Sequence, residues 1–399
     1  MTVMTQAAEE VLGPAALTGA EIGRMTSAIT GLPQRAADVR MTPLDCDPGS
    51  PATGGLWQVD VLDSAGAAVY AYFVKLLRHT RLWPGLKYLP DDASRAEFID
   101  FFPWRAELEM HQSGIAAVLP DGMRAPVLHH VKYADADHIA LWWEFVPQRP
   151  EPWQSADYRR AAYLLGRLAA RRRDGADVNQ ALPAVARVPH PEGSALRYFT
   201  ERRVYLGALP YLRDEALWRH PVLAAALERT GDHALPGELL ALGGRLPRIL
   251  DLLDTLPQTH AHGDASPQNL LLPANEPDTI VVIDWGFGTL LPVGFDLGQL
   301  LAGLAQAGKA DPGDLSVIDP VIFDGYLAGL HAEGYEAEPV VVRTGYLGGL
   351  AARSALCTLP LELLTSATPT GETVASFVHG LRLARVLVDL ASQLPLPAP

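Results

Sequence analysis

Residues 259–288 read THAHGDASPQNLLLPANEPDTIVVIDWGFG and contain two polar motifs on which the fold prediction depends. The first is HGDASPQN, in which Asp264 precedes Asn269 by five positions. The second is DWG, which follows the apolar, β-branched run TIVVI. Because such runs favour buried strands, we expect Asp284 to leave the end of a strand and Gly286 to let the chain turn away directly after it.

An aspartate, an asparagine and a strand-terminal aspartate, in this order, are what phosphoryl transfer to a hydroxyl requires. The phosphoryl group in transfer spreads negative charge over its oxygens, and Mg²⁺, which prefers carboxylate and amide oxygens, neutralises that charge. We therefore expect Asn269 and Asp284 to bind Mg²⁺, and Asp264 to orient the attacking hydroxyl and accept its proton. The alternative interpretation is that Asp264 and Asn269 cap a turn and that DWG is an ordinary strand exit.

The sequence HGDASPQN followed by IDWG resembles the aminoglycoside phosphotransferase and choline kinase group, relatives of protein kinases that phosphorylate small molecules. Protein kinases usually have His-Arg-Asp and Asp-Phe-Gly, so His-Gly-Asp and Asp-Trp-Gly favour the small-molecule branch. The resemblance implies a structural role for His262. It also implies that Asp296 hydrogen-bonds the catalytic loop, although an N-cap role for Asp296 is equally natural.

The same resemblance implies an α+β, two-lobed protein-kinase-like fold. The N-lobe would be a small antiparallel β-sheet with one main helix, and the C-lobe would be large and mainly helical. We expect a leader with a short helix at residues 1–35, the N-lobe at 36–146 and the C-lobe at 147–399. The implied reaction transfers the γ-phosphoryl group of ATP or GTP to a hydroxyl of a small molecule, with Mg²⁺ as the metal cofactor.

The predicted N-lobe begins with strands at 38–44 and 56–62, joined by the loop 50–55. Glycines in such a loop can let backbone N–H groups approach phosphates, so Thr53, Gly54 and Gly55 are candidate nucleotide-binding residues. The alternative is an ordinary hairpin loop.

A third strand at 69–77 carries Lys75. A lysine on a largely apolar strand needs a partner, because a buried unpaired charge is costly, unless it snorkels from the strand end. The resemblance supplies the nucleotide phosphates and a helix glutamate as partners. Glu107, on a helix expected from 104 to 114, matches that glutamate. Glu109 is the fallback, since it points to a different face, and the alternative for either is a solvated helix face.

Further strands are expected at 125–133 and 139–146, and a long connection at 78–103. The resemblance implies a hinge at Glu144, Phe145 and Val146, whose backbone groups would hydrogen-bond adenine. After the hinge, we expect a helix capped by Ser155 and Leu/Ala-rich helical segments near 194–209, 214–229, 236–254 and 373–394. Four acidic residues in the helical region are interpreted as surface groups rather than substrate ligands: Asp214, Glu215, Glu228 and Asp232.

The amino-acid composition limits the classes of molecule that the protein can bind. The net charge of −14 argues against nucleic acid, whose phosphates require a basic surface. This charge would suit a cationic substrate, although solubility is the simpler explanation. Two cysteines, Cys46 and Cys357, give no disulfide framework. The sequence shows neither a signal-peptide pattern nor an apolar run near the ~18 residues of a membrane span, so we expect a cytoplasmic enzyme without a membrane partner.

Three substrate roles remain open at this point. The enzyme could inactivate an antibiotic, or it could be a metabolic or biosynthetic kinase of choline, amino-sugar or nucleoside type. From another class, a non-catalytic nucleotide-binding sensor on the same fold would bind a nucleotide without transferring phosphate. The sensor is disfavoured, because each catalytic position of the implied family is filled.

Overall fold

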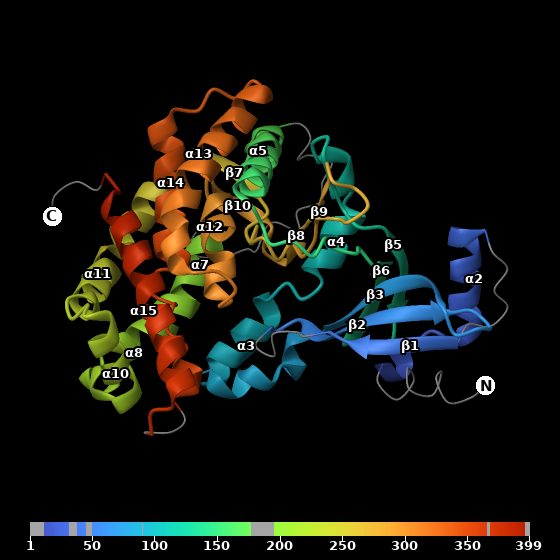
Figure 1. The fold of residues 1–399 in the computed structure, drawn as a ribbon, viewed down its shortest axis with the longest axis horizontal. Coiled ribbons are helices and arrows are strands. Elements are labelled where there is room, and N and C mark those ends of the chain that lie inside the picture. Colours follow the sequence, from blue (N-terminus) through green and yellow to red (C-terminus); the bar gives the residue numbers. More distant parts are fainter. Residues whose placement is uncertain are drawn as a thin grey trace. The chain divides into compact units, whose positions relative to one another are not determined.

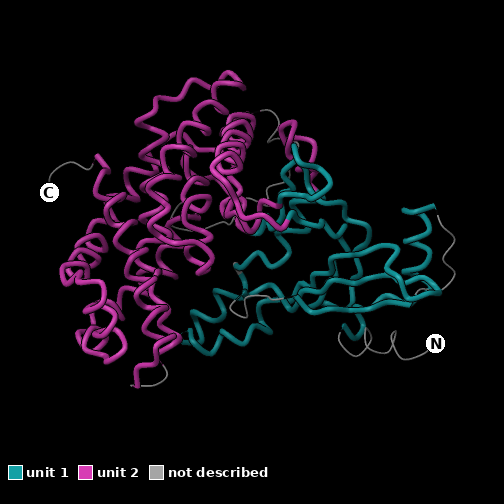
Figure 2. The backbone as a smooth tube through the Cα atoms, in the orientation of Figure 1, with its two compact units in different colours: residues 1–112, 124–149, 272–286 teal, residues 113–123, 150–271, 287–399 magenta. Residues whose placement is uncertain are grey.

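The structure is a computed structural model and describes residues 12–31, 38–44, 50–89, 91–176, 195–364 and 368–395. These residues form two compact units (Figure 2). Unit 1 contains residues of Met1–Gln112, Arg124–Arg149 and Leu272–Gly286. Unit 2 contains residues of Ser113–Met123, Pro150–Leu271 and Phe287–Pro399. The DWG motif therefore belongs to unit 1, whereas Asp264 and Asn269 belong to unit 2.

Unit 1 is built on an antiparallel five-stranded sheet with the order β1-β2-β3-β6-β5 (Figure 1). The strands are β1 (Asp38–Pro43), β2 (Thr53–Leu62), β3 (Ala68–Arg78), β5 (Leu128–Tyr133) and β6 (His138–Glu144). Each overlaps a strand predicted from the sequence, at 38–44, 56–62, 69–77, 125–133 or 139–146. Two short strands, β4 (Met123–Arg124) and β9 (Ile280–Val282), complete the strands that contribute residues to unit 1.

One face of this sheet packs against the N-terminal segment. Helix α2 (Gly19–Thr30), the short helix expected within residues 1–35, begins at the capping box of Thr18 and Glu21 and ends at Gly31. Its Ile22 joins the core, together with the turn η1 (Gly13–Ala15). The hydroxyl of Thr26 hydrogen-bonds the hydroxyl of Tyr72 on β3 at 2.9 Å. The segment expected as a leader is thus packed into unit 1.

One local prediction in unit 1 is wrong, and a second segment contains more regular structure than was predicted. Thr53, Gly54 and Gly55 lie in β2 rather than in a loop, and the register with β3 shifts between Thr53 and Gly55. The connection 78–103 is not irregular: it contains η2 (Thr80–Leu82), η3 (Pro84–Tyr88) and helix α3 (Asp92–Phe101). The N-cap of α3 is Asp91, whose carboxylate accepts from the Ser94 N–H at 2.7 Å.

Unit 2 is mainly helical. Its longer helices are α5 (Ser155–Arg171), α10 (Pro221–Thr230), α11 (Leu235–Asp254), α12 (Asp296–Gln306), α13 (Leu315–Ala332), α14 (Pro339–Arg353) and α15 (Gly371–Ser392). Its shorter ones are η4 (Ile115–Val118), α7 (Ala195–Thr200), the π-helix η6 (Glu201–Ala208), α8 (Leu209–Arg213), α9 (Glu215–Arg219), η8 (Pro312–Asp314) and η9 (Leu361–Leu363). Strand β7 (Gln258–Ala261) pairs antiparallel with β10 (Thr289–Pro292), and β8 is Leu270–Leu271. No helix in the described ranges is both long and apolar enough to cross a membrane.

The start of α5 differs from the prediction. Ser155 is already helical, and the cap is Gln154, whose N–H donates to the carboxylate of Asp157 at 2.8 Å. A serine before an apolar pattern therefore marked the start of the helix to within one residue. It was not itself the capping group.

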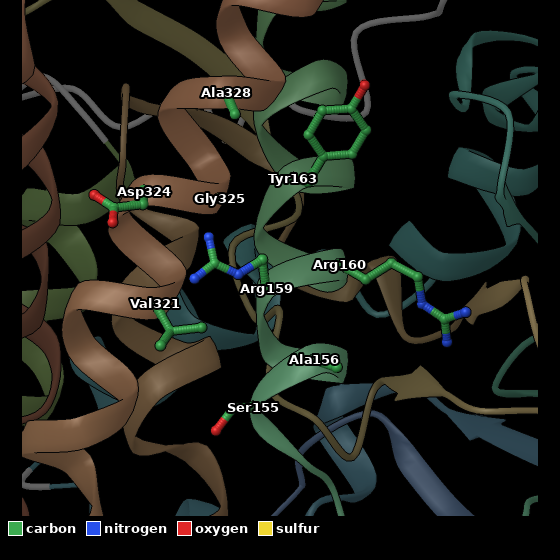
Figure 3. Close-up of a pocket in the computed structure, with 9 residues that line it drawn as sticks. All are labelled: Ser155, Ala156, Arg159, Arg160, Tyr163, Val321, Asp324, Gly325 and Ala328. Carbon is green, nitrogen blue, oxygen red and sulfur yellow. The ribbon is translucent and has the colours of Figure 1, made fainter.

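Helices α5 and α13 approach so closely that glycine is required between them. A Cβ at Gly166 would lie 2.2 Å from the carbonyl oxygen of Tyr326, and one at Gly329 would lie 2.0 Å from that of Tyr163. Nearer the start of α5 the same two helices border a groove of about 540 Å³, where the side chain of Arg159 extends from α5 toward α13 (Figure 3). None of the predicted site residues lines this groove.

Candidate active site

Unit 1 brings three of the predicted site residues together. The Nζ of Lys75 lies 2.5 Å from Oε2 of Glu107 and 3.5 Å from Oδ1 of Asp284. The side chains of Lys75 and Glu107 are 9% and 11% exposed, whereas that of Asp284 is 41% exposed. Glu109, the fallback partner, is exposed on the other side of its helix. The glutamate that the resemblance implied is therefore the one that contacts Lys75.

Helix α4 (Ala106–Gln112) places Glu107 by packing on the sheet. Its Leu108 and the preceding Trp104 belong to a core cluster with Leu77 of β3 and with Ile139 and Leu141 of β6. Glu107 directly precedes Leu108 on this helix. In the sheet, Lys75 stands opposite Leu56 of β2 and Leu141 of β6. The apolar pattern of α4 thus fixes the carboxylate beside the lysine.

Charge keeps Lys75 protonated. Burial alone would lower the pKa of this ammonium, but the carboxylates of Asp284 and Glu107 outweigh burial, and the pKa of Lys75 is raised above its ordinary value. Burial in turn raises the pKa of Glu107, against the attraction of Lys75. An ammonium held in this way can donate hydrogen bonds to phosphate oxygens at neutral pH.

Asp284 has an unusual backbone. Among the described non-glycine residues it alone has a φ in the left-handed region, at 57°. Aspartate tolerates this region better than most residues, and such conformations concentrate at functional sites. The sequence predicts the turn at Gly286, but the residue in the left-handed region is the metal-binding candidate Asp284 itself. Gly286 lies in the short 3₁₀ turn η7 (Trp285–Phe287).

In unit 2 the loop that follows β7 is held by Asp296. The carboxylate of Asp296 accepts hydrogen bonds from the backbone N–H groups of His262, at 3.0 Å, and Gly263, at 2.8 Å. The N-cap of α12 is Phe295, with no side-chain cap. Of the two roles considered for Asp296, the structure shows the bond to the loop and not the N-cap. Burial raises the pKa of the Asp296 carboxyl, while His262 and the two backbone donors lower it.

The middle residue of His-Gly-Asp must be glycine. Gly263 has φ +80°, and a Cβ there would lie 2.2 Å from the carbonyl oxygen of Phe287. The preceding His262 is fully buried, and its Nδ1 accepts from the backbone N–H of Asp264 at 3.2 Å. His262 therefore supports the backbone at Asp264, in agreement with the structural role that the resemblance implies.

The Asp264 carboxylate is held at both oxygens. The Nδ2 of Asn269 lies 3.1 Å from Oδ2 of Asp264 and 2.8 Å from its carbonyl oxygen. Arg353, the last residue of α14, donates to Oδ1 of Asp264 at 2.6 Å and also donates to the carbonyl oxygen of Gly263. In this arrangement the Oδ1 of Asn269 has no hydrogen bond among the described residues, which leaves an amide oxygen for a cation.

Arg353 was not identified from the sequence. It lies 89 residues after Asp264, at a helix C-terminus, where an arginine is ordinary. Its guanidinium lies 5.3 Å from the ring centroids of both Phe199 and Phe287, and its side chain is 13% exposed. Burial lowers the pKa of Arg353, and Asp264 opposes that shift. No periodicity or spacing in the sequence could have connected these four residues.

The hinge residues differ in what they can offer a nucleotide. The Glu144 carboxylate accepts from both terminal nitrogens of Arg124, at 2.6 and 2.9 Å, and Arg124 also binds Glu276. The N–H groups of Glu144 and Phe145 donate to the carbonyls of Val127 and Ala71. Neither backbone group of Val146 hydrogen-bonds within the part of the chain that the structure describes.

Comparison with known proteins identifies the family. Residues 86–337 match the family model described as "Phosphotransferase enzyme family". None of the curated proteins compared with the chain matches it.

The fold is similar to solved structures of low sequence identity. An aminoglycoside phosphotransferase from Alicyclobacillus acidocaldarius is 14% identical, with a TM-score of 0.49, over 88% of this chain and 92% of that one. An amicoumacin kinase in complex with AMP-PNP, Ca²⁺ and Ami is 13% identical, with a TM-score of 0.48, over 90% of each chain. An ethanolamine kinase from Plasmodium vivax is 13% identical, with a TM-score of 0.45, over 87% of this chain and 81% of that one.

The family match covers more than half of the chain and confirms the predicted α+β, two-lobed protein-kinase-like fold. The described sheet of unit 1 and helices of unit 2 are the elements that this fold combines. The chain, an ATP-dependent phosphotransferase, belongs to the phosphotransferase enzyme family.

Proposed function

We propose that the enzyme transfers the γ-phosphoryl group of ATP, or of GTP, to a hydroxyl group of a small molecule. The observation that carries this proposal is the buried contact of Lys75 with both Glu107 and Asp284. Three segments of the sequence supply these residues, and a phosphoryl-transfer site needs all three together.

In the proposed reaction the acceptor hydroxyl oxygen forms a bond to the γ-phosphorus. The bond from that phosphorus to the β,γ-bridging oxygen breaks, and the nucleoside diphosphate leaves with the bonding electrons. The hydroxyl proton passes to the carboxylate of Asp264, which Asn269 and Arg353 hold in one orientation. A positioned carboxylate of this kind converts a diffusive encounter into an oriented attack.

The donor set suits Mg²⁺. The free amide oxygen of Asn269 and the partly exposed carboxylate of Asp284 are hard oxygen ligands, and Mg²⁺ bound to a nucleotide needs only one or two protein carboxylates. Accordingly, no group of three or more His, Cys, Asp or Glu side chains in the described ranges is arranged to hold a metal ion. When bound, the ion would neutralise charge on the phosphate oxygens.

Within unit 1 we assign the nucleotide to Lys75 and the hinge. Lys75 would donate to the α- and β-phosphates, and Val146, with both backbone groups available, would hydrogen-bond the base next to Glu144 and Phe145. Gly54 and Gly55 precede Leu56, the residue opposite Lys75, so their strand runs beside the lysine. We propose that Thr53, Gly54 and Gly55 act from this strand rather than from a flexible loop.

The acceptor class is the open part of the proposal. An antibiotic and a hydroxylated metabolite both fit a small-molecule kinase, and the cytoplasm, where nucleotide and Mg²⁺ are abundant, is the proposed setting. A screen of Mg-ATP and Mg-GTP consumption over aminoglycosides, other hydroxylated antibiotics, choline, amino sugars and nucleosides addresses this question directly.

The test of the catalytic assignment uses Asp264→Asn in the same assay. This variant should lose at least ~100-fold in kcat while it still binds nucleotide, because the proton acceptor is removed and the unit 1 contacts remain. The matched control is Glu109→Gln, which alters an exposed carboxylate. Turnover by Asp264→Asn at the wild-type rate would overturn the assignment of the base.

A further inference from the structure

Two arginines lie over one aromatic ring next to the proposed base. Arg353 lies 5.3 Å from the ring centroid of Phe199, and Arg203 lies 5.7 Å from the same centroid. Arg353 is already occupied, because it binds Asp264 and the carbonyl oxygen of Gly263. Because both distances are measured to the same ring, the two guanidinium groups are close enough for one small molecule to contact both.

Arg203 has no carboxylate partner among the described residues, and it is exposed. This is unusual in a chain with 46 acidic and 32 basic residues, where an exposed cation readily finds an acid. The nearby Arg197, for example, binds both Asp251 and Asp254. The charge of Arg203 is felt at the site: after burial, it is among the causes that lower the pKa of Arg353.

The backbone that carries Arg203 is a π-helix, η6, of eight residues. π-Helical turns are rare and occur frequently at functional sites. In η6 two successive arginines each lie over the ring four residues earlier: Arg202 over Tyr198, at 5.3 Å, and Arg203 over Phe199. A guanidinium stacked on a ring is already ordered, so it loses less freedom when it binds an anion.

An exposed aromatic side chain, that of Phe287, lies near Arg203. The side chain of Phe287 is 43% exposed and meets Phe199 edge to face, with centroids 6.2 Å apart. Its ring also lies 5.3 Å from the guanidinium carbon of Arg353. One exposed guanidinium without a carboxylate partner among the described residues and one exposed aromatic ring therefore lie close to Arg353, which binds the Asp264 carboxylate.

We propose that Arg203 and Phe287 bind the acceptor, and that the acceptor is a hydroxyl compound with an oxyanion group and an apolar face. This inference rests on the proposed function, since it names the substrate of the same site. A guanidinium binds carboxylate and phosphate oxygens through paired hydrogen bonds, and the aromatic ring covers the apolar part. A polycationic acceptor would instead meet the uncompensated charge of Arg203, and like charges repel.

The test compares acceptors that differ only in charge. We suggest 4-substituted benzyl alcohols that carry a carboxylate, a phosphate monoester, a neutral methyl group or an aminomethyl group, together with the natural-product acceptors found in the general screen. The proposal expects kcat/KM to be highest for one of the two anionic compounds, and the carboxylate and phosphate arms distinguish the two oxyanions.

Charge reversal at Arg203 tests the proposal with any acceptor, whatever its carbon skeleton. Arg203→Glu should raise the KM of an anionic acceptor by about ten- to hundredfold and lower that of a cationic one, with the KM of the nucleotide unchanged. Arg203→Gln, which keeps the length of the chain, should show a smaller rise. The matched control is Arg213→Glu, an exposed arginine beyond the π-helix, and melting temperatures establish that all three variants fold.

The outcomes separate the two proposals. If the enzyme turns over only cationic acceptors, or if Arg203→Glu leaves the KM of an anionic acceptor unchanged, the acceptor inference is wrong and the proposed function stands. If no acceptor of any charge stimulates nucleotide consumption and Asp264→Asn behaves as the wild type, the proposed function fails, and the inference fails with it.

Discussion

The guanidinium of Arg353 donates to the Oδ1 of Asp264 at 2.6 Å, and this contact fixes the carboxylate that we assign as the base. The second oxygen of Asp264 is held by Asn269. A carboxylate restrained at both oxygens cannot rotate away from the acceptor, yet it keeps lone pairs for one more hydrogen bond. The arginine thus acts on the reaction through the orientation of Asp264.

Replacement of Arg353 should separate catalysis from nucleotide binding. We expect Arg353→Met to lower kcat by roughly 100-fold with little change in the KM of the nucleotide, because a misplaced base costs about that much. It should also lower the free energy of unfolding by about 3–5 kcal/mol, since the Asp264 charge loses its buried partner. Arg353→Lys should restore part of the kcat.

The control for that variant lies on the same helix. Arg343 binds Asp319 through two hydrogen bonds of 2.6 and 2.8 Å. Arg343→Met should destabilise the protein in chemical denaturation but leave kcat close to wild type. An equal loss of kcat in both variants would show that stability alone explains the effect.

The pair Lys75 and Glu107 should show strong coupling. We expect Lys75→Met to lower nucleotide affinity at least ~10-fold and to destabilise the fold by about 3 kcal/mol, because it leaves a buried carboxylate without a cation. Adding Glu107→Leu should recover stability without recovering affinity. Calorimetric titration with AMP-PNP and urea unfolding measure the two effects, and additive losses in stability would contradict the coupling.

Asp284 permits a test of charge without a change in backbone strain. Asparagine tolerates the left-handed region as aspartate does, so Asp284→Asn, which loses only the charge beside Lys75, should lower the melting temperature less than Asp284→Ala. Both variants should lose most of the Mg²⁺-dependent increase in nucleotide affinity. Titrations with and without EDTA measure that increase, and an increase of wild-type size in Asp284→Asn would remove Asp284 from the metal site.

A methyl group at Gly263 should be far more damaging than one at another left-handed glycine. Gly263→Ala would place its Cβ 2.2 Å from the carbonyl oxygen of Phe287, whereas Gly231, with φ +67°, has nothing within 4 Å of the added Cβ. We expect Gly231→Ala to cost about 1 kcal/mol from backbone strain alone. Gly263→Ala should cost several times more in denaturation and abolish turnover; similar losses would argue against the tight contact.

Stability between α5 and α13 should depend on pH through Glu333. Burial would raise the pKa of Glu333, but hydrogen bonds from Arg171 and Arg167 outweigh burial and lower it. A lowered carboxylate pKa stabilises the fold above the unfolded value of about 4.3, and this contribution is lost as the pH falls through the folded value.

Glu333→Gln should therefore cost about 1 kcal/mol at pH 7 and almost nothing near pH 3, as measured by denaturation at each pH. The exposed Glu336 provides the control, because Glu336→Gln should change neither value. A loss that stayed constant from pH 3 to pH 7 would mean that the ion pairs of Glu333 are not its source.

Motif spacing predicted the residues that lie close to one another in sequence or on regular elements. The choice of Glu107 and the link between Asp296 and the loop both followed from the family resemblance, and helix periodicity added only that Glu109 points to a different face. Arg353 and Arg203 escaped prediction because their roles depend on packing around Phe199, which local sequence does not encode. The helix α3 was missed although Asp91 supplied a cap, because the Gly and Pro residues that precede it indicated turns.

The two peptide groups on either side of Gly263 are held by residues of two different helices. The start of α12 binds the N–H of Gly263 through Asp296, and the end of α14 binds its carbonyl oxygen through Arg353. Because each of these two successive peptide groups has a fixed partner, neither can rotate freely, and the loop is ordered before any ligand arrives. Substrate binding then costs no conformational entropy to order the loop. A substitution in α14 that moves Arg353 would alter turnover, although α14 lies far from the loop in the sequence.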